Sequence, residues 1–340
     1  MDYGFSEEQI MIRDMARRIA NEKAMPIREK LDETGEFPWE VVKACSQFNL
    51  FGIGIEEKYD GIGGGTLEYC IATEELSAVC GGIALAFAGT GLGTMPIILF
   101  GDEEQKKKYL PWVAKGEKLA AFGLTEANAG SDAGGIQTTA KKSGDYYILN
   151  GTKQWITNGG EAGTYTVIAL TDKSKGARGA SAFIVEKDAP GFTFGKKENK
   201  MGIRASATRE LVFQDCKVHK SQLLGKEGLG FIVAMKTLDK TRPGIAAQAV
   251  GIAQGALNAA VKYSREREQF GAKISSFQAI QHMLADMATQ VEAARMLVYA
   301  AARAIDSGSK DISKISAMCK LFASDTCLLY TSPSPRDRQK

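Results

Sequence analysis

The sequence predicts an α+β protein of several domains, with helical segments on both sides of a β-rich middle. Two capping-box patterns, at residues 6–9 and 102–105, begin helices within the first 118 residues. Short alternating segments between residues 119 and 225 indicate strands. Helical periodicity then returns from Gly230 onwards. A chain of 340 residues is long enough for two or three domains.

Residues 1–118 are expected to form an α-helical domain. Apolar residues follow the first capping box at helical spacing, until Pro26 interrupts the helix. Pro38 begins a second helix, and Leu67 to Val79 forms a third. The stretch from Gly81 to Gly101 is uncharged and contains six Gly or Pro before its last residue. We therefore expect a buried, closely packed helix there and no membrane span.

Residues 119–225 are expected to form an all-β domain, a small barrel or a sandwich. Two alternating segments flank a Ser-Gly-Asp turn at residues 143–145. Asn150-Gly151 predicts a further hairpin turn, which would lead into a strand at 152–156. Four more short segments are predicted strands: Tyr165–Leu170, Ala182–Glu186, Phe192–Phe194 and Glu210–Phe213.

Residues 226–326 are expected to form a second α-helical domain. The first helix runs from Gly230 to about Arg267 and should kink near Pro243. A second helix is predicted from about Ser276 to Ser307, and a third begins near Ile312.

The composition excludes several classes of function. The net charge of +3 gives no reason to expect nucleic acid as a partner. Six scattered cysteines without a Cys-x-x-Cys pair fit buried thiols in a reducing compartment, and two histidines are too few for a His-based metal centre. We expect no metal and no signal peptide. The glycines at 61–65 follow no buried strand, which argues against a dinucleotide-binding fold.

Two segments of the predicted β domain carry the residue types that a flat heteroaromatic cofactor needs. Residues 121–132 begin as a strand and break into turn residues, and residues 155–158 precede two glycines. Donors at the edge of a ring and an aromatic plane against its face would suit a flavin. Two ordinary polar loops are the alternative interpretation. The segments together offer three hydroxyls and two aromatic rings: Thr125, Ser131, Thr157, Phe122 and Trp155.

These segments resemble the flavin signatures of the acyl-CoA dehydrogenase family, of the medium- and short-chain type. Leu-Thr-Glu-x-x-Ala-Gly-Ser-Asp at 124–132 matches the first signature, and Trp-Ile-Thr-Asn at 155–158 matches the second. Leu-Asp-Lys-Thr-Arg-Pro at 238–243 and Glu-Arg-Glu-Gln-Phe-Gly at 266–271 match later motifs. The resemblance runs from about residue 5 to about residue 326. It implies a β-barrel between two helical domains, the last of which would be most of a four-helix bundle, and it implies FAD as the cofactor.

The resemblance implies two groups of FAD contacts. The first would meet the flavin ring and the ribityl chain, with Thr157 near N5: Phe122, Leu124, Thr125, Ser131, Trp155, Ile156 and Thr157. The second would hold the pyrophosphate and adenosine of FAD in a neighbouring subunit: Arg267, Gln269, Phe270 and Gln278. The protein would then be a homo-oligomer, and we expect a tetramer. Without the resemblance, Arg267 would be a solvated charge at a helix end. Phe122 replaces a tyrosine of the medium-chain pattern, which removes one hydroxyl.

Acyl-CoA contacts are implied for Ser131, Asp239, Thr241 and Arg242. Asp239 and Arg242 are three residues apart on a helix, so an ion pair worth about 0.3–0.5 kcal/mol is the alternative. Some branches of the family carry the catalytic glutamate on this helix, but the threonine at 241 matches branches whose base lies further along. By resemblance, Ala84 and Ala88 face the acyl pocket.

We expect this chain to contain no catalytic residue, because the base glutamate of the family is missing from it. Residues 320–326 begin the family's run towards that glutamate, whereas residues 327–340 contain no Glu. The resemblance therefore implies a C-terminal truncation followed by an unrelated tail. We interpret the tail as foreign or frame-shifted; a flexible tail on a degenerate member is the alternative.

The function that the resemblance implies is dehydrogenation of a saturated acyl-CoA to a trans-2-enoyl-CoA. Electrons would pass to an electron-transfer flavoprotein, and the chain as written is expected to be inactive. Three alternatives stay open: a flavin oxidase of the same fold, an enoyl-CoA reductase, and a non-catalytic relative that binds acyl-CoA or flavin. The expected location is the cytoplasm of a bacterium, or the mitochondrial matrix if the source is eukaryotic.

Overall fold

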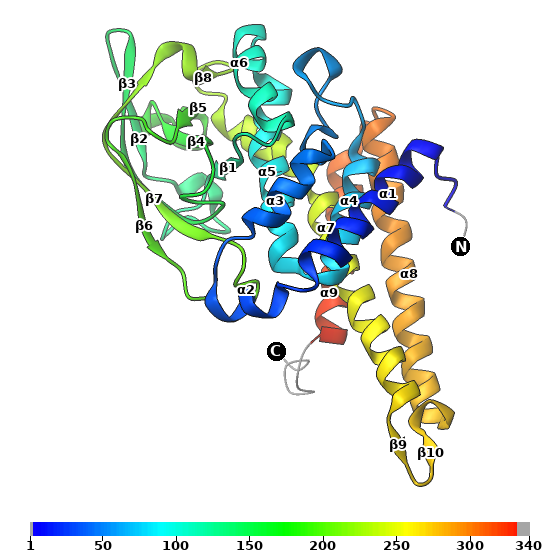
Figure 1. The fold of residues 1–340 in the computed structure, drawn as a ribbon. Coiled ribbons are helices and arrows are strands. Elements are labelled where there is room, and N and C mark those ends of the chain that lie inside the picture. The colour runs from blue at the N-terminus through cyan, green and yellow to red at the C-terminus, as the bar shows by residue number, and fades with distance from the viewer. Residues whose placement is uncertain (1–2, 332–340) are drawn as a thin grey trace. The chain divides into compact units, whose positions relative to one another are not determined.

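Residues 3–331 are described by a computed structural model, in which the chain forms two compact units (Figure 1). The described parts of the first unit are residues 3–26, 65–84 and 242–331. The second unit contains residues 27–64 and 85–241. Each unit therefore combines segments that are far apart in the sequence, and the expected N-terminal range contributes to both.

The first unit begins with α1 (Glu7–Ile19), and its predicted capping box is confirmed. The hydroxyl of Ser6 accepts from the backbone N–H of Gln9, whose side chain accepts from the N–H of Ser6. A π-helical turn at Ala20–Ala24 ends this segment before Pro26. The N-terminus of α4 (Thr66–Val79) is capped from a distant helix, because Asp306 accepts from the N–H groups of residues 66 and 67 at 2.8 and 3.0 Å.

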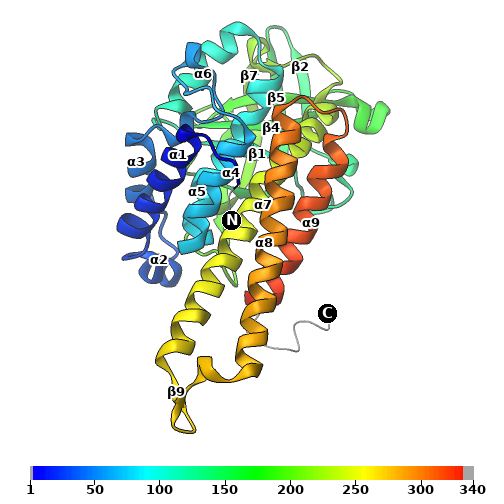
Figure 2. The same cartoon turned by 90° about the vertical axis from the view of Figure 1, so that its right-hand side faces the viewer.

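Three long helices follow in the C-terminal part of the chain: α7 (Gly230–Glu266), α8 (Gln278–Asp306) and α9 (Ile312–Thr331). A hairpin of β9 (Glu268–Gln269) and β10 (Ala272–Lys273) connects α7 to α8, as Figures 1 and 2 show. The helices α4, α7, α8 and α9 contribute to one core, which includes Leu67, Val250, Val291, Val298 and Cys319. No break occurs near residue 326, where the sequence resemblance was expected to end.

The second unit contains α2 (Arg28–Thr34), α3 (Trp39–Gln47), α6 (Glu103–Ala114) and most of α5 (Gly81–Phe100). The helix predicted after Pro38 is confirmed, and so is the capping box that Asp102 and Gln105 form. Sequence patterns missed α2, whose single buried side chain, Leu31, leaves no apolar periodicity.

The predicted β domain is an eight-stranded sheet in the order β6-β7-β3-β2-β4-β5-β8, with β1 parallel to β4. The other pairs are antiparallel, except for one parallel bridge between β2 and β4. The strands are β1 (Ala120–Gly123), β2 (Thr139–Ser143), β3 (Tyr146–Thr157), β4 (Thr164–Leu170), β5 (Ala180–Glu186), β6 (Phe192–Lys197), β7 (Thr208–His219) and β8 (Leu223–Leu224).

The hairpin predicted at Asn150-Gly151 is wrong. Strand β3 continues through both residues and pairs with β7 on either side, with a register shift between Leu149 and Gly151. Gly151 has a φ of 143°, and a Cβ there would lie 2.5 Å from Oγ1 of Thr138. The glycine therefore serves a bulge and a close chain approach, which the same two letters can encode as well as a turn.

Two glycines of α5 allow this helix to lie directly on the sheet. A Cβ on Gly93 would be 2.4 Å from the backbone nitrogen of Ala121, and one on Gly89 would be 2.7 Å from Cγ2 of Thr157. Small residues in α5 thus bring its backbone against β1 and the end of β3. By length and composition, α5 and α7 are the two described helices that could cross a membrane, and 61% of the relevant window of α5 is buried.

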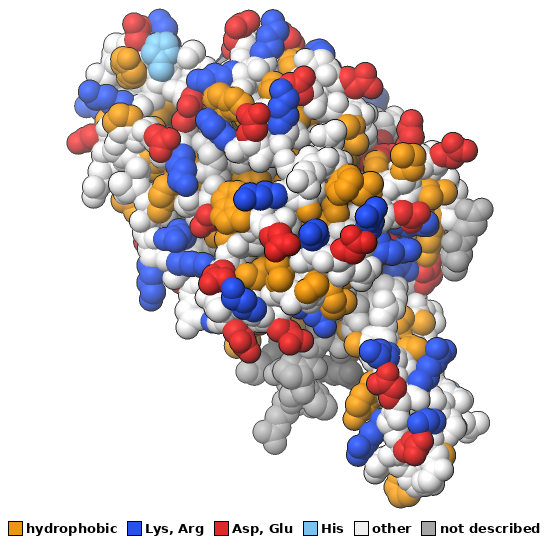
Figure 3. Space-filling view, in the orientation of Figure 1, with side chains coloured by type: hydrophobic (Ala, Val, Ile, Leu, Met, Phe, Trp, Pro, Cys, Tyr) orange, Lys and Arg blue, Asp and Glu red, His pale blue; other side chains and the backbone are white. Residues whose placement is uncertain are grey.

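The visible surface mixes both signs of charge. In Figure 3, Lys and Arg alternate with Asp and Glu over the coloured part of the face shown, and apolar groups lie between them. All six cysteines are free thiols, and four of them are buried.

Candidate functional site

The first candidate segment leaves β1 beside β3. Phe122 is half-buried and pairs with Thr166 of β4, while Leu124 is buried just beyond the strand. The carbonyl of Thr125 accepts from the backbone N–H of Gln154 at 2.8 Å. This bond joins the segment to the residue just before the second candidate segment, so the two motifs predicted from sequence lie close together.

A bulge near the end of β3 presents Trp155 to the surface. The pairing of β3 with β7 shifts between Lys153 and Ile156, and Trp155 has a φ of 57°. Its side chain is 54% exposed, whereas the side chain of Ile156 is buried. A bulge re-aims a side chain in this way and is common beside functional sites.

Asn158 ties the second segment to its surroundings, and sequence analysis gave it no role. It is buried with a φ of 61°, and its Nδ2 donates to Oγ1 of Thr90 at 3.1 Å and to the carbonyl of Ala120 at 3.3 Å. These bonds connect the end of β3 with α5 and β1. The Gly-Gly pair after Asn158 is the sequence feature that could have indicated this role, because it marks a turn at the end of the strand.

A buried ion pair, which the sequence patterns did not predict, connects the first segment with the strand that leads into the second. Nζ of Lys153 is 2.6 Å from Oε1 of Glu126, and the side chains are 0% and 9% exposed. Burial lowers the pKa of Lys153 to about 8. Burial alone would raise the pKa of Glu126. The pKa is nevertheless lowered, because the carboxylate is stabilised by Lys153 and by the N–H groups of Gln137 and Thr138.

Arg209 lies against the turn that follows Trp155. A Cβ on Gly160 would be 3.0 Å from Nε of Arg209, and among the described residues this buried Nε has no hydrogen-bond partner. The strand predicted from residue 210 began too late to include it, because Thr208 and Arg209 interrupt the apolar alternation.

The residues at this site fit a flavin. Within residues 3–331, the hydroxyls of Thr125, Ser131 and Thr157 make no hydrogen bond to a protein group; Ser131 is exposed and both threonines are half-buried. These unused hydroxyls are groups for the edge of a planar cofactor, and the exposed ring of Trp155 and the half-buried ring of Phe122 are groups for its face.

The second group of predicted FAD contacts lies on the other unit. Arg267, Gln269 and Phe270 are exposed at the hairpin between α7 and α8, and Gln278 is exposed at the first residue of α8. Phe270 is 96% exposed with a φ of 52°. These four residues therefore share one end of the α7–α8 pair, where they are open to a ligand or a second chain.

The predicted substrate contacts lie on α7, apart from Ser131. Asp239, Thr241 and Arg242 are half-buried, and the boundary between the two units falls between residues 241 and 242. The hydroxyl of Thr241 donates to the carbonyl of Thr237 at 2.9 Å. Its side chain is thus occupied by the helix backbone.

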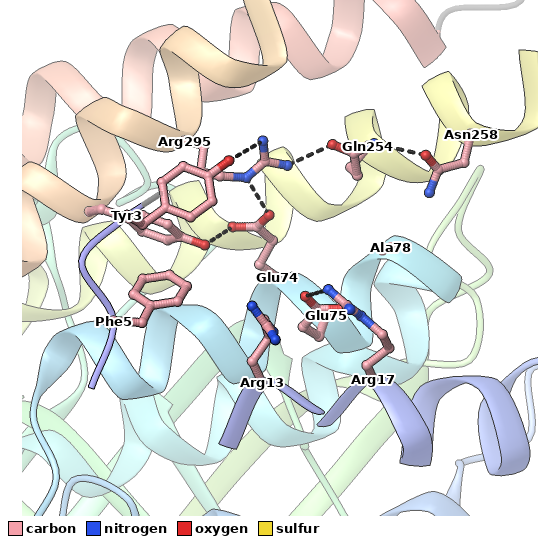
Figure 4. A pocket seen from close by; sticks show the side chains of 11 residues that line it. Tyr3, Phe5, Arg13, Arg17, Glu74, Glu75, Ala78, Gln254, Asn258 and Arg295 are labelled. Atoms are coloured by element: carbon pink, nitrogen blue, oxygen red, sulfur yellow. Dashed lines mark hydrogen bonds and ion pairs between the residues drawn. The ribbon is translucent and has the colours of Figure 1, made fainter. Parts of the chain in front are cut away.

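A cavity of about 330 Å³ in the first unit is a separate feature (Figure 4). Its polar side chains pair with each other: Arg295 lies 2.7 Å from Glu74, and Tyr299 donates to the same carboxylate at 2.8 Å. It contains none of the predicted site residues. In residues 3–331, no group of three or more His, Cys, Asp or Glu side chains could hold a metal ion.

Family models match nearly the whole chain. The N-terminal, middle and C-terminal domain models of the acyl-CoA dehydrogenases match residues 6–117, 121–216 and 228–331. The order of domains and the fold define a flavin-dependent oxidoreductase. The chain belongs to the acyl-CoA dehydrogenase family.

Named relatives agree with these matches. The chain is 49% identical to the short-chain-specific acyl-CoA dehydrogenase of Clostridium acetobutylicum over 98% of its own length and 88% of the relative. It is 47% identical to the acryloyl-CoA reductase (NADH) of Anaerotignum propionicum over 98% of its length and 84% of the relative.

Solved structures share the fold. The butyryl-CoA dehydrogenase of Megasphaera elsdenii matches with a TM-score of 0.95 at 46% identity, over 100% of this chain and 89% of the other. A chain in the structure of the electron transferring flavoprotein of Acidaminococcus fermentans matches with a TM-score of 0.96 at 51% identity, over 99% and 89%. An acyl-CoA dehydrogenase of Bacillus anthracis complexed with FAD matches with a TM-score of 0.83 at 38% identity, over 96% and 57%. The cofactor of this chain is FAD.

The expected truncation near residue 326 is not borne out. The C-terminal family model continues to residue 331, and α9 runs without interruption to the same residue. The predictions of an incomplete bundle and of an inactive chain both rested on this truncation, so they are not supported. Of the tail expected at residues 327–340, residues 332–340 lie outside the described residues.

Proposed function

We propose that the protein dehydrogenates a saturated acyl-CoA to a trans-2-enoyl-CoA and passes the electrons to an electron-transfer flavoprotein. The observation that carries this proposal is that two neighbouring segments present an exposed tryptophan ring together with hydroxyls that make no hydrogen bond to a described protein group. The similarity to enzymes named short-chain-specific acyl-CoA dehydrogenase and butyryl-CoA dehydrogenase supports it. When bound, FAD would accept the hydride that leaves the β-carbon of the acyl chain, while a general base takes the proton from the α-carbon.

In this proposal the two segments have different tasks. Phe122, Leu124 and Thr125 hold one side of the flavin, and Ser131 lies where flavin and acyl-CoA meet. Trp155 packs against the ring, Ile156 fixes the strand beneath it, and Thr157 donates to N5. A donor held at N5 favours the electron-rich, reduced ring. The bulge at Trp155 supports this assignment, because it leaves the ring of Trp155 exposed while the next residue, Ile156, is buried.

Substrate binding is proposed for Ser131, Asp239, Thr241 and Arg242. On α7, Asp239 and Arg242 are three residues apart and therefore share a face of the helix, whereas Thr241 lies between them on another side. Because the hydroxyl of Thr241 donates to its own helix, we assign this residue a packing role towards the substrate. We assign no proton acceptor among residues 3–331, and the expected absence of the base from this chain stays a prediction.

We further propose that the protein is a homotetramer in which FAD is shared between subunits. Arg267, Gln269, Phe270 and Gln278 would contact the pyrophosphate and adenosine of the cofactor held by a neighbouring subunit. The exposure of all four residues at one hairpin supports this role. A bacterial cytoplasmic location is proposed from the bacterial relatives.

A reductase is the second candidate. It is favoured by the relative named acryloyl-CoA reductase (NADH), which is as similar to this chain as several dehydrogenases are. The same site could serve both directions, since a group that stabilises the transition state lowers the barrier for the forward and the reverse step alike.

Anaerobic titration separates these functions. The FAD-loaded protein is mixed with butyryl-CoA, and the flavin absorbance and the acyl products are measured. The proposed dehydrogenase loses its flavin absorbance and forms the trans-2-enoyl-CoA. A flavin that stays oxidised with butyryl-CoA, yet mediates reduction of an enoyl-CoA by NADH through an electron-transfer flavoprotein, would establish the reductase instead. Rapid reoxidation by oxygen would indicate an oxidase.

A further inference from the structure

Lys153 holds the two flavin segments together from below. Its Nζ donates to the carbonyl of Leu124 at 2.9 Å and pairs with Oε1 of Glu126 at 2.6 Å. The next residue, Gln154, donates its backbone N–H to the carbonyl of Thr125 at 2.8 Å. Three consecutive residues of the first segment are thus bonded to the two residues that immediately precede the second.

Glu126 also closes the loop that follows it. Its Oε2 accepts from the N–H of Gln137 at 2.6 Å, and its Oε1 accepts from the N–H of Thr138 at 3.0 Å. The chain between these anchors contains Ser131 and only one short 3-10 turn, Ala133–Gly135, as regular structure. The carboxylate therefore ties the end of this loop to its start, and buried Ala129 and Ile136 pack the loop against the core.

The pair is almost completely buried, which makes it different from the surface pairs. The side chain of Lys153 is 0% exposed and that of Glu126 is 9% exposed. A buried charge needs its partner, because water cannot replace it. Loss of either member leaves the other buried without its counter-charge, which weakens the bonds that hold the loop.

We propose that Glu126 and Lys153 are positioning residues for FAD, which fix the spacing between the segment at 122–131 and the segment at 155–157. Neither side chain needs to touch the cofactor. Their bonds place the ring of Trp155 and the hydroxyls of Thr125 and Ser131 so that they meet one flavin. This inference rests on the proposed function of both segments.

The alternative is that the pair only stabilises the fold. An exposed pair in the same domain provides the matched control: Lys220 lies 2.8 Å from Asp145, and the side chains are 59% and 66% exposed. It joins two chain segments as the buried pair does, but it anchors no flavin segment. Lys220→Met should therefore leave FAD binding unchanged.

The test uses the full chain with FAD removed and compares wild type, Glu126→Gln, Lys153→Met, the double variant and Lys220→Met. The dissociation constant of FAD and its visible circular dichroism are measured on variants whose far-ultraviolet spectrum is native. Amide hydrogen exchange of residues 137, 138 and 154 is measured without FAD. We expect each single variant to weaken FAD binding about 10- to 100-fold, by analogy with the loss of metal affinity when groups that orient metal ligands are removed.

The double variant removes both charges, so it keeps the proposal testable if a single variant does not fold. It should fold, bind FAD more weakly than wild type and exchange the three amides faster. Unchanged FAD affinity and dichroism in folded variants would overturn the proposal, and so would an equal loss in Lys220→Met. Failure of the wild-type chain to bind FAD would instead refute the proposed function itself.

Discussion

Single residues at the candidate site owe their roles to contacts across the β domain. Trp155 and Thr157 were predicted from a motif, and the bulge at the end of β3 explains how one becomes exposed while Ile156 between them stays buried. Lys153, Asn158 and Arg209 were not predicted, because their importance comes from partners far away in the sequence. Lys153 and Glu126 are 27 residues apart, and no periodic pattern connects them.

The ion pair should give the stability of the protein a distinctive pH dependence. Burial lowers the pKa of Lys153 from 10.5 to about 8, so between these values the unfolded chain binds a proton that the folded chain does not. Stability should therefore rise with pH in this window, by at most about 1.4 kcal/mol per pH unit. The pKa of Glu126 is lowered, so its contribution is present above 4.5 and is lost as the pH falls below that value.

This pH dependence is measured by denaturant unfolding of the FAD-free wild type and of the FAD-free double variant Glu126→Gln/Lys153→Met. The difference in the free energy of unfolding should move in favour of the wild type from pH 8 to pH 10.5. It should move against the wild type below pH 4.5. Parallel curves across both ranges would show that the pair does not titrate as proposed.

At the scale of the element, helix starts were predictable and sheet details were not. Ser6 and Asp102 begin their helices as the capping boxes predict, because those contacts lie within four residues. Asn150-Gly151 was misassigned, because its bulge depends on a pairing with β7 that sequence alone does not reveal. The hairpin at 268–273 escaped notice, since two-residue strands show no alternation.

The contact between α5 and β1 is testable through Gly93. A Cβ at this position would lie 2.4 Å from the backbone nitrogen of Ala121, which cannot move without shifting β1. Gly93→Ala should therefore lower the free energy of unfolding by about 1–3 kcal/mol, as overpacking does. Gly54→Ala is the control, because no atom lies within 4 Å of a Cβ built there. Equal stability of the two variants in denaturant titrations would rule out a tight contact.

The whole molecule follows the family's order of domains, which the sequence motifs indicated in advance. The compact units, however, combine residues 3–26 and 65–84 with the C-terminal helices, and combine 27–64 with the β domain. Such long-range grouping depends on core contacts such as those of Leu67 with the C-terminal helices, which local patterns do not encode.

FAD sharing between subunits predicts a selective effect of Arg267→Ala. In the described part of the chain, the guanidinium of Arg267 makes no hydrogen bond or ion pair, so the FAD-free variant should keep its stability within about 0.5 kcal/mol. A lost contact to phosphate should weaken FAD binding about 10- to 100-fold. The exposed Arg265, two residues earlier, gives the control variant Arg265→Ala.

FAD titrations at several protein concentrations complete this test, since a shared cofactor binds more tightly as subunits associate. Equal FAD affinity in Arg267→Ala and wild type would remove Arg267 from the site. Affinity independent of protein concentration, in a range where the subunits dissociate, would argue against sharing.

In the proposed site the flavin ring packs against Trp155, and tryptophan fluorescence measures this contact. The chain has three tryptophans, so the double variant Trp39→Phe/Trp112→Phe leaves Trp155 as its only tryptophan. Its side chain is 54% exposed, and ring contact with bound FAD should quench its emission almost completely and saturably. Stoichiometric FAD binding that leaves the emission of Trp155 unchanged would contradict the account.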